Sequence, residues 1–212
     1  MIDQLLEEIG EDKHQNMTTT SLKLKRDVWE FFQGFEDKIA VEFGTHKGQT
    51  TKILSHLFKK VYTVNNQDNA EAKRLNEDIQ NIEYISNFDL YSKKHLPIKD
   101  IVDVFFIDAG HSYEQVLLDA QRAINMKCAK KCYIIFDDYG LQNHSDNVKR
   151  AVDKIISTNT LMLVKGIGHT EGHSFNNSDP NYNLIGPEGL ITTANWEEII
   201  KLSNKLKSLK NE

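Results

Sequence analysis

One short stretch, residues 41–51, most constrains the fold of this chain. It reads Val-Glu-Phe-Gly-Thr-His-Lys-Gly-Gln-Thr-Thr, and an apolar, β-prone run at residues 38–41 leads into it. Gly44 and Gly48 are four positions apart, and a helical pattern begins directly after them. A strand, a glycine turn and a helix in this order place a backbone loop and a helix N-terminus beneath a ligand in α/β folds. The stretch therefore predicts an α/β fold with a ligand site at this turn.

The rest of the chain alternates between β-prone and helical segments. After residues 39–42, short runs rich in Val, Ile, Tyr and Phe predict strands at 61–64, 82–85, 102–107, 132–136 and 161–164. Apolar residues at helical spacing lie between most of these runs. Repeated β-α units predict a mostly parallel sheet with helices on both faces.

Composition excludes some classes of function. The net charge is −5, and no basic face stands out, which argues against a nucleic-acid partner. No apolar run approaches the ~20 residues of a membrane span, and no signal peptide is visible. Cys128 and Cys132 have no neighbouring ligand cluster, so we expect reduced structural thiols and a cytoplasmic protein.

Acidic residues follow three of the predicted strands. They are Glu42, Asp108 and the pair Asp137–Asp138. Since the carboxyl ends of parallel strands meet at one edge of a sheet, these carboxylates should gather there. Two interpretations stay open. Asp108, Asp137 and Asp138 hold a hard divalent cation, or each caps the loop or helix that follows.

The glycine turn itself also has two interpretations. Its spacing is G-x-x-x-G, and the acid precedes the turn, whereas the dinucleotide fingerprint is G-x-G-x-x-G with an acid about 20 residues later. The turn could also be a tight strand-to-helix connection without a ligand.

Three motifs taken together resemble a known family. Residues 42–48 resemble motif I of the class I S-adenosylmethionine-dependent methyltransferases. Residues 106–113 (Phe-Ile-Asp-Ala-Gly-His-Ser-Tyr) and 135–140 (Ile-Phe-Asp-Asp-Tyr-Gly) resemble methyltransferase family 24, the branch related to macrocin O-methyltransferases and more distantly to catechol O-methyltransferase. The resemblance covers about residues 36–165 and implies a Rossmann-like three-layer sandwich around a mostly parallel, seven-stranded sheet.

The resemblance implies roles for the residues of the turn. Glu42 would lie near the amino acid end of the cofactor, where a carboxylate suits an ammonium group. Gly44 and Gly48 would let the backbone approach the methionine part closely, and any side chain at Gly44 should clash. Thr45 and Gln49 would supply hydrogen bonds at the start of the helix.

The nucleoside part of the cofactor is expected further along the chain. The family usually has Asp or Glu at the end of the second strand, whereas this sequence has Asn65, which loses the charge-assisted bond to the ribose. Asp68 is the candidate substitute. Asn87, Phe88 and Asp89 fall where the family holds adenine.

For catalysis, the resemblance maps Asp108, Asp137 and Asp138 onto the Mg²⁺-binding acids of the branch, and Asp108 also onto the cofactor site. A metal-bound hydroxyl has a lowered pKa, and the resulting alkoxide or phenolate would attack the methyl group in line. His111 is the candidate general base, because imidazole titrates near neutral pH. Its alternative role is to orient Asp108.

Other histidines lie in predicted loops at the same edge. His144, His169 and His173 could touch the substrate or face solvent. The Gly-His-Thr-Glu-Gly-His sequence that contains His169 and His173 has no zinc-like neighbour to complete a site.

These features predict one methyltransferase domain. We expect N-terminal helices in residues 1–35, a cofactor-binding core in 36–165, and substrate-side loops with a C-terminal helix from about 196 to 209 in 166–212. The predicted function is Mg²⁺-assisted O-methylation of a small hydroxylated acceptor such as a sugar or a natural product, with S-adenosylmethionine as cofactor. A non-catalytic cofactor-binding domain and a nicotinamide-dependent oxidoreductase are the alternatives. A homo-oligomer stays open.

Overall fold

The protein is described by a computed structural model over residues 1–200, apart from residues 93, 127, 196 and 198. The described strands form one seven-stranded sheet in the order β3-β2-β1-β4-β5-β7-β6. The strands are β1 (Ile39–Phe43), β2 (Lys60–Val64), β3 (Ile82–Ile85), β4 (Val102–Ile107), β5 (Cys128–Phe136), β6 (Leu161–Ile167) and β7 (Gly189–Ala194). The helices are α1 (Ile2–Ile9), α2 (Leu22–Phe31), α3 (Gln49–Leu57), α4 (Ala70–Leu75), α5 (Tyr113–Asn125) and α6 (Arg150–Ser157).

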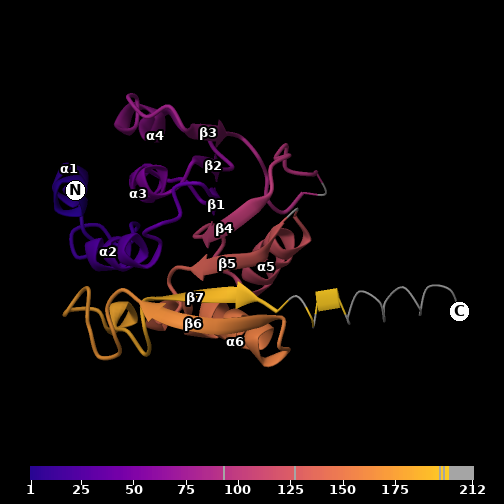
Figure 1. Ribbon diagram of the computed structural model, residues 1–212. Helices are drawn as coiled ribbons and strands as arrows, with labels where there is room; N and C mark the ends of the chain where they lie inside the picture. The colour runs from indigo at the N-terminus through magenta and orange to yellow at the C-terminus, as the bar shows by residue number, and fades with distance from the viewer. Residues whose placement is uncertain (93, 127, 196, 198, 201–212) are drawn as a thin grey trace, which may run out of the picture.

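Helices cover both faces of the sheet, as the alternating pattern predicted. Figure 1 shows α1, α2 and α3 on one side and α5 and α6 on the other. β4 pairs in parallel with β1 and β5, and its neighbouring side chains Phe105 and Phe106 are both buried, one in each apolar layer. This burial explains why β4 is apolar throughout rather than alternating. The predicted three-layer sandwich with a mostly parallel sheet is confirmed.

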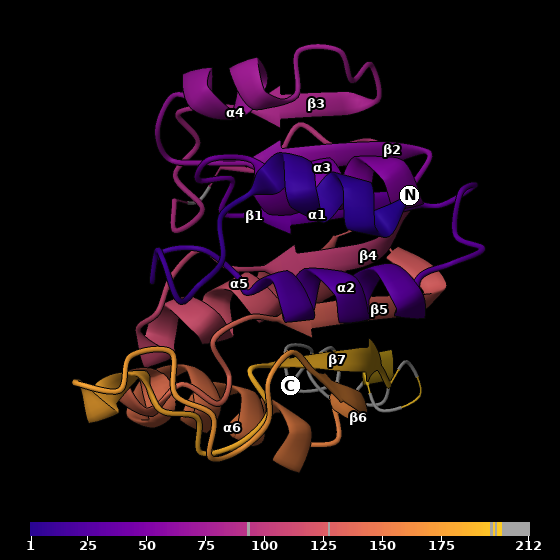
Figure 2. The same cartoon turned by 90° about the vertical axis from the view of Figure 1, so that its left-hand side faces the viewer.

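The sheet reverses its strand order between β1 and β4, which is where α/β sheets bind ligands. In Figure 2 the arrowheads of β1, β2 and β4 point to the same edge. Two segments far apart in the sequence also lie at this edge. One is the N-terminal strap, which we define as residues 10–21 between α1 and α2, and the other is the loop of residues 168–188 that precedes β7.

The structure corrects the prediction for the end of the chain. The sequence analysis assigned loops and a terminal helix to residues 166–212 and omitted β7, which pairs antiparallel with β5 and β6. The Thr192 hydroxyl donates to the carbonyl of Ile134 at 2.8 Å, so a polar residue is buried in this strand. The predicted helix from about 196 to 209 lies almost wholly outside the described residues.

The structure also shows the state of the two cysteines and the length and apolar character of the helices. Cys128 and Cys132 are free thiols, and Cys132 is buried. Among the described helices, none combines the length and the apolar character that crossing a membrane would require.

Candidate functional site

In the turn after β1, the surrounding residues leave no room for a side chain at either glycine. Gly44 has a φ of 95°, and a Cβ atom there would lie 1.8 Å from the carbonyl oxygen of Asp108. Gly48 has a φ of 78°, and its Cβ would lie 2.6 Å from the Cβ of Ala72 in α4. A side chain at Gly44 would therefore clash, as predicted, but it would clash with backbone at the end of β4. These glycines bring the turn, β4 and α4 together.

A cleft of about 410 Å³ opens beside this turn. It brings together four of the predicted site residues, which are Gly44, Asn65, Asp108 and His111. Sequence analysis missed other residues of its wall, among them His46, Asn66, Leu90 and Tyr91. Asn65 follows β2 and His111 follows β4, so the cleft spans the point where the strand order reverses.

The residues predicted to hold adenine do not line this cleft. Phe88 packs on the core, with the Arg122 guanidinium 5.8 Å from its ring centre. The Asp89 carboxylate accepts a hydrogen bond from the backbone N–H of Tyr91 at 2.8 Å. Asn87 is exposed and has a φ of 56°. These residues shape the turn that presents Tyr91, and Tyr91 itself faces the cleft.

Asp68, the candidate substitute for the missing acid after β2, also lies away from the cleft. Its side chain is exposed and is 4.0 Å from the ammonium of Lys73. The neighbouring amides Asn66 and Gln67 line the cleft instead. The turn after β2 therefore contributes amides and no acidic side chain to the lining of the cleft.

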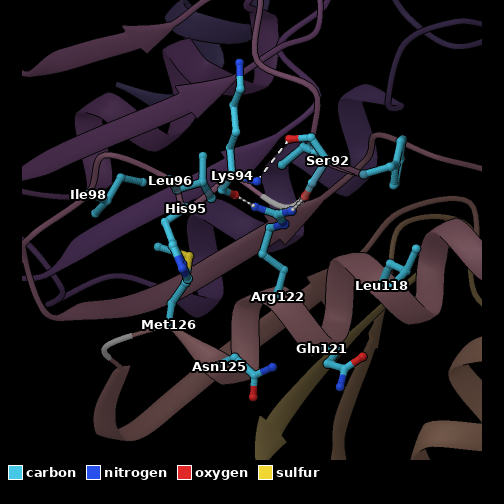
Figure 3. A pocket seen from close by; sticks show the side chains of 12 residues that line it. Ser92, Lys94, His95, Leu96, Ile98, Leu118, Gln121, Arg122, Asn125 and Met126 are labelled. Atoms are coloured by element: carbon cyan, nitrogen blue, oxygen red, sulfur yellow. Dashed lines mark hydrogen bonds between the residues drawn. The ribbon is translucent and has the colours of Figure 1, made fainter.

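A second cavity, of about 590 Å³, lies between the segment 90–98 and α5. Figure 3 shows Arg122 reaching from α5 to this segment, where it donates to the carbonyl oxygens of Ser92 and Lys94. The cavity shares Leu90 and Tyr91 with the cleft but contains none of the predicted site residues. The two hydrogen bonds of Arg122 hold the segment that begins at Leu90 and Tyr91 against α5.

Glu42 lines a separate small space beside the cleft, which shares Gly44 and Asp108 with it. It is buried, and its Oε2 accepts hydrogen bonds from the hydroxyls of Thr51 and Thr63. Burial raises the pKa of Glu42 to about 8. The Thr45 hydroxyl lies 2.6 Å from the Thr63 hydroxyl, so both are already paired. The space beside Glu42 measures about 10 Å³, the limit for one water molecule.

The N-terminal strap lines this small space beside Glu42. Gln49 donates to Glu11 at 2.7 Å and accepts a hydrogen bond from the Thr19 hydroxyl at 2.6 Å. The Lys47 ammonium pairs with the Glu11 carboxylate at 3.1 Å. Gln49, predicted as a cofactor ligand, thus holds the strap in this structure. No prediction from the sequence covered these contacts.

The three predicted acids come together at the carboxyl edge. Asp108, Asp137 and Asp138 each place a carboxylate oxygen within 4.8 Å of the others. Asp137 Oδ1 is buried and has no hydrogen-bond partner among the described residues. Burial raises the pKa of Asp137 well above its usual value, against the opposing charge of Lys13. Burial would also raise the pKa of Asp138, but Lys13 and His111 hold the pKa of that carboxyl below its usual value.

Lys13, from the strap, is the buried cation of this cluster. Its ammonium lies 2.6 Å from Asp138 Oδ1, 3.7 Å from Glu188 Oε1 and 3.9 Å from Asp137 Oδ2. Burial alone would lower its pKa, but the surrounding carboxylates raise the pKa of Lys13 well above its usual value, so it stays charged. No local sequence signal identifies Lys13, because 125 positions separate it from Asp138.

Two stacked histidines border the acids. The Ser112 side chain caps α5 and so fixes the turn that presents His111. His111 Nε2 lies 3.2 Å from Asp138 Oδ2 and 3.6 Å from Asp108 Oδ1, and these carboxylates raise the pKa of His111 to about 10. His144 stacks on His111 with ring centres 4.7 Å apart, and burial lowers its pKa. At neutral pH, His111 is therefore an imidazolium and His144 a neutral imidazole.

Comparison with known proteins identifies a similar sequence family and similar folds. Residues 41–139 match the family model described as a methyltransferase domain, methyltransferase family 24. The O-methyltransferase TomG of Streptomyces achromogenes, solved with S-adenosylmethionine, superposes with a TM-score of 0.64 at 11% identity, over 91% of this chain and 88% of TomG. The tRNA (m1A58) methyltransferase TrmI of Aquifex aeolicus gives 0.58 at 16% identity, over 90% of this chain and 75% of TrmI.

One curated relative is also similar in sequence. It is the uncharacterized protein R132 of Acanthamoeba polyphaga mimivirus, 27% identical over 140 residues. The match covers 58% of this chain and 61% of the relative, so the chain spans about three fifths of that protein. The solved structures, all below 25% identity, establish the fold, and the family model covers the turn, the cleft and the acids.

Proposed function

We propose that this chain, whose residues 41–139 match the methyltransferase family model, transfers the methyl group of S-adenosylmethionine to a hydroxyl of a small acceptor, as its three motifs predicted. The observation that carries this proposal is the cleft, which runs from Asn65 past Gly44 to the carboxylate of Asp108 and the ring of His111. S-adenosylmethionine supplies a methyl group on a positively charged sulfur when it is bound. Uncharged amides at one end and carboxylates at the other suit a nucleoside beside a sulfonium.

The chain's own residues fit the parts of this cofactor. The Asn65 amide can accept from one ribose hydroxyl and donate to another. Leu90 and Tyr91 form a partly apolar wall that fits adenine. Glu42 is suited to the ammonium group, which would favour its charged form. Because the space beside Glu42 is so small, the methionine part enters only after the strap moves.

The acid cluster fits a hard divalent cation. Its donors are carboxylate oxygens, the ligands that Mg²⁺ prefers, and the buried Asp137 Oδ1 lacks a partner among the described residues. Asp108, Asp137 and Asp138 would hold the cation, which lowers the pKa of a bound acceptor hydroxyl. Lys13 neutralises the same oxygens in this structure. The ammonium and the cation therefore compete for Asp138.

We assign the role of proton acceptor to one of the two stacked histidines, His144. The lowered pKa of His144 supports it as the neutral imidazole that takes the hydroxyl proton, and the raised pKa of His111 supports a role in holding Asp108 and Asp138. Turnover should then rise with pH through a midpoint below pH 6.5 and level off above that midpoint. A rate that keeps rising toward pH 10 would instead support His111 as the base, which is the role predicted from the sequence.

The acceptor is proposed to be a small hydroxylated molecule of the sugar or natural-product type. TomG is involved in tomaymycin synthesis, whereas TrmI methylates tRNA, so the fold alone admits both classes. The net charge of −5 favours the small acceptor, because an RNA partner selects for a basic surface.

The test combines calorimetry with a turnover assay. We expect S-adenosylhomocysteine to bind with micromolar affinity, and a panel of hydroxylated acceptors to be methylated in the presence of Mg²⁺. Binding without turnover on any acceptor would favour the non-catalytic alternative, and no binding at millimolar ligand would reject the proposal. Full activity in chelator would remove the metal from it.

A lysine variant tests the cation site directly. Since Lys13 contacts the oxygens that would hold Mg²⁺, Lys13→Met should raise Mg²⁺ affinity by at least about tenfold, because the competing charge is gone. Lys23→Met removes an exposed lysine as the matched control. Unchanged affinity in Lys13→Met would mean that the acids do not bind the cation.

A further inference from the structure

Two histidines of the loop before β7 are held side by side. The rings of His169 and His173 stack with centres 3.7 Å apart and planes within 10°. Their backbone is fixed from both sides, because His169 accepts from the N–H of Glu188, and His173 accepts from the N–H of Leu184. The positive φ angles of Gly168 and Gly172 shape the two turns that precede them.

The strap supplies the third histidine. His14 Nε2 lies 3.1 Å from His173 Nε2, and the rings of His14 and His169 are 6.0 Å apart. His14 Nδ1 lies 3.2 Å from the carbonyl oxygen of Phe175. A carbonyl oxygen only accepts, so Nδ1 carries the proton and Nε2 keeps its lone pair. A backbone carbonyl on the far nitrogen is the usual partner of a metal-binding histidine.

The spacing of the three nitrogens suits a borderline cation once one of the two stacked rings turns so that both lone pairs face the ion. One ring nitrogen from each of His14, His169 and His173 lies within 4.8 Å of the others. Two nitrogens bound to one tetrahedral Zn²⁺ lie about 3.4 Å apart, close to the separation of the two Nε2 atoms. Asp12 and Glu188 carry negative charge near these rings, which favours a bound cation.

We propose that His14, His169 and His173 form a binding site for Zn²⁺ or a similar borderline divalent cation, separate from the acid cluster. His14 is exposed and the other two are half-buried, so water can fill the fourth position. The site joins the strap to the loop 168–188. Because Lys13 precedes His14, the bound cation also fixes the ammonium that reaches Asp138.

This site completes the Gly-His-Thr-Glu-Gly-His sequence, which lacks a third ligand nearby in the chain. The competing explanation is an ordinary hydrogen bond between His173 and His14 combined with ring stacking. That arrangement leaves the histidines without affinity for a metal. The two explanations differ in one measurable quantity, the affinity of these residues for a nitrogen-preferring cation.

The experiment titrates the metal-stripped full-length chain with Co²⁺, whose absorption spectrum reports the ligands, in excess Mg²⁺ to occupy the acids. We expect a tetrahedral Co²⁺ spectrum with one equivalent bound. His14→Gln and His173→Gln should each weaken this binding by at least about tenfold. His95→Gln, at an exposed histidine far along the chain, should leave it unchanged.

A second variant separates this site from the histidines beside the acids. His111, Asp138 and His144 also form a possible ligand group, so His144→Gln is titrated in parallel. Loss of the Co²⁺ signal in His144→Gln but not in His14→Gln would overturn the proposal, as would the absence of any Co²⁺ binding. Circular dichroism verifies that each variant is folded. The proposal does not rest on methyl transfer, because its readout is metal binding alone.

Discussion

The candidate site has two halves that differ in charge and in closure. The proposed nucleoside half is the cleft around Asn65 and Tyr91, which is open and lined by amides and apolar groups. The acid half, around Asp137 and Asp138, adjoins the cleft at His111 and is buried and crowded with charge. Each half lies at the carboxyl ends of parallel strands, so the sheet alone does not explain the difference.

The difference comes from the N-terminal strap. Lys13 reaches the acids, and Glu11 and Thr19 cover the small space beside Glu42, whereas none of the described strap residues lines the cleft around Asn65 and Tyr91. Burying several carboxylates is unfavourable unless cations accompany them. The acid half is therefore stable in this form because a distant segment neutralises it. This suggests that chemistry and cofactor recognition can be perturbed separately.

The largest expected effect tests this separation. Asp137→Asn should lower turnover by about a thousandfold, because an amide weakens the cation site whose charge stabilisation is worth several kcal/mol. S-adenosylhomocysteine affinity, measured by calorimetry, should change little. Asp68→Asn, at an exposed carboxylate outside the cleft, is the control. An equal loss of cofactor affinity in Asp137→Asn would show that the halves are not independent.

The next effect is expected where the halves meet. Gly44→Ala forces a Cβ into the Asp108 carbonyl, and we expect cofactor affinity to fall by at least about a hundredfold, with a lower Tm. Gly34→Ala is the matched control, since Gly34 has a similar φ of 85° but nothing within 4 Å of its Cβ. It should show only the cost of the strained backbone, about 1 to 2 kcal/mol. Similar losses in both variants would mean that the contact with Asp108 does not matter.

The same contrast explains what the sequence could predict. The turn at Gly44 and the acids after β4 and β5 are local patterns, and parallel strands bring their ends together, so Asp108, Asp137 and Asp138 were placed correctly. β7 was omitted because a short run beside Gly and Pro carries little periodicity. The roles of Lys13 and His14 depend on contacts across more than 120 positions, which no local pattern encodes.

The nucleoside residues show a different limit. Position relative to β3 indicated Asn87, Phe88 and Asp89, but the turn after this strand has its own geometry, with a positive φ at Asn87. That conformation shifts the lining residues two positions on, to Leu90 and Tyr91. Aligning a motif shows where a loop begins, whereas the backbone angles of the loop decide which side chains face the cleft.

A smaller effect concerns the pH dependence of stability at Glu42. Its pKa is about 8 in the folded protein and near 4.5 when exposed, so the folded state binds more protons between these values, and the free energy of unfolding falls as pH rises through this window. Glu42→Gln cannot lose a proton. Its Tm relative to wild type should therefore increase from pH 5 to pH 8, as measured by thermal unfolding. A constant difference would argue that Glu42 is already ionised at pH 5.

The smallest effect tests the open half. Asn65→Asp restores the acid that the family usually carries and should tighten S-adenosylhomocysteine binding about fivefold, because a charged acceptor adds about 1 kcal/mol to a hydrogen bond. Asn66→Asp places the same charge one residue away in the same cleft. A gain in Asn65→Asp alone identifies a contact with the ribose. An equal gain in both variants would come from the general field of an added negative charge, and the nucleoside half would then owe its recognition to shape.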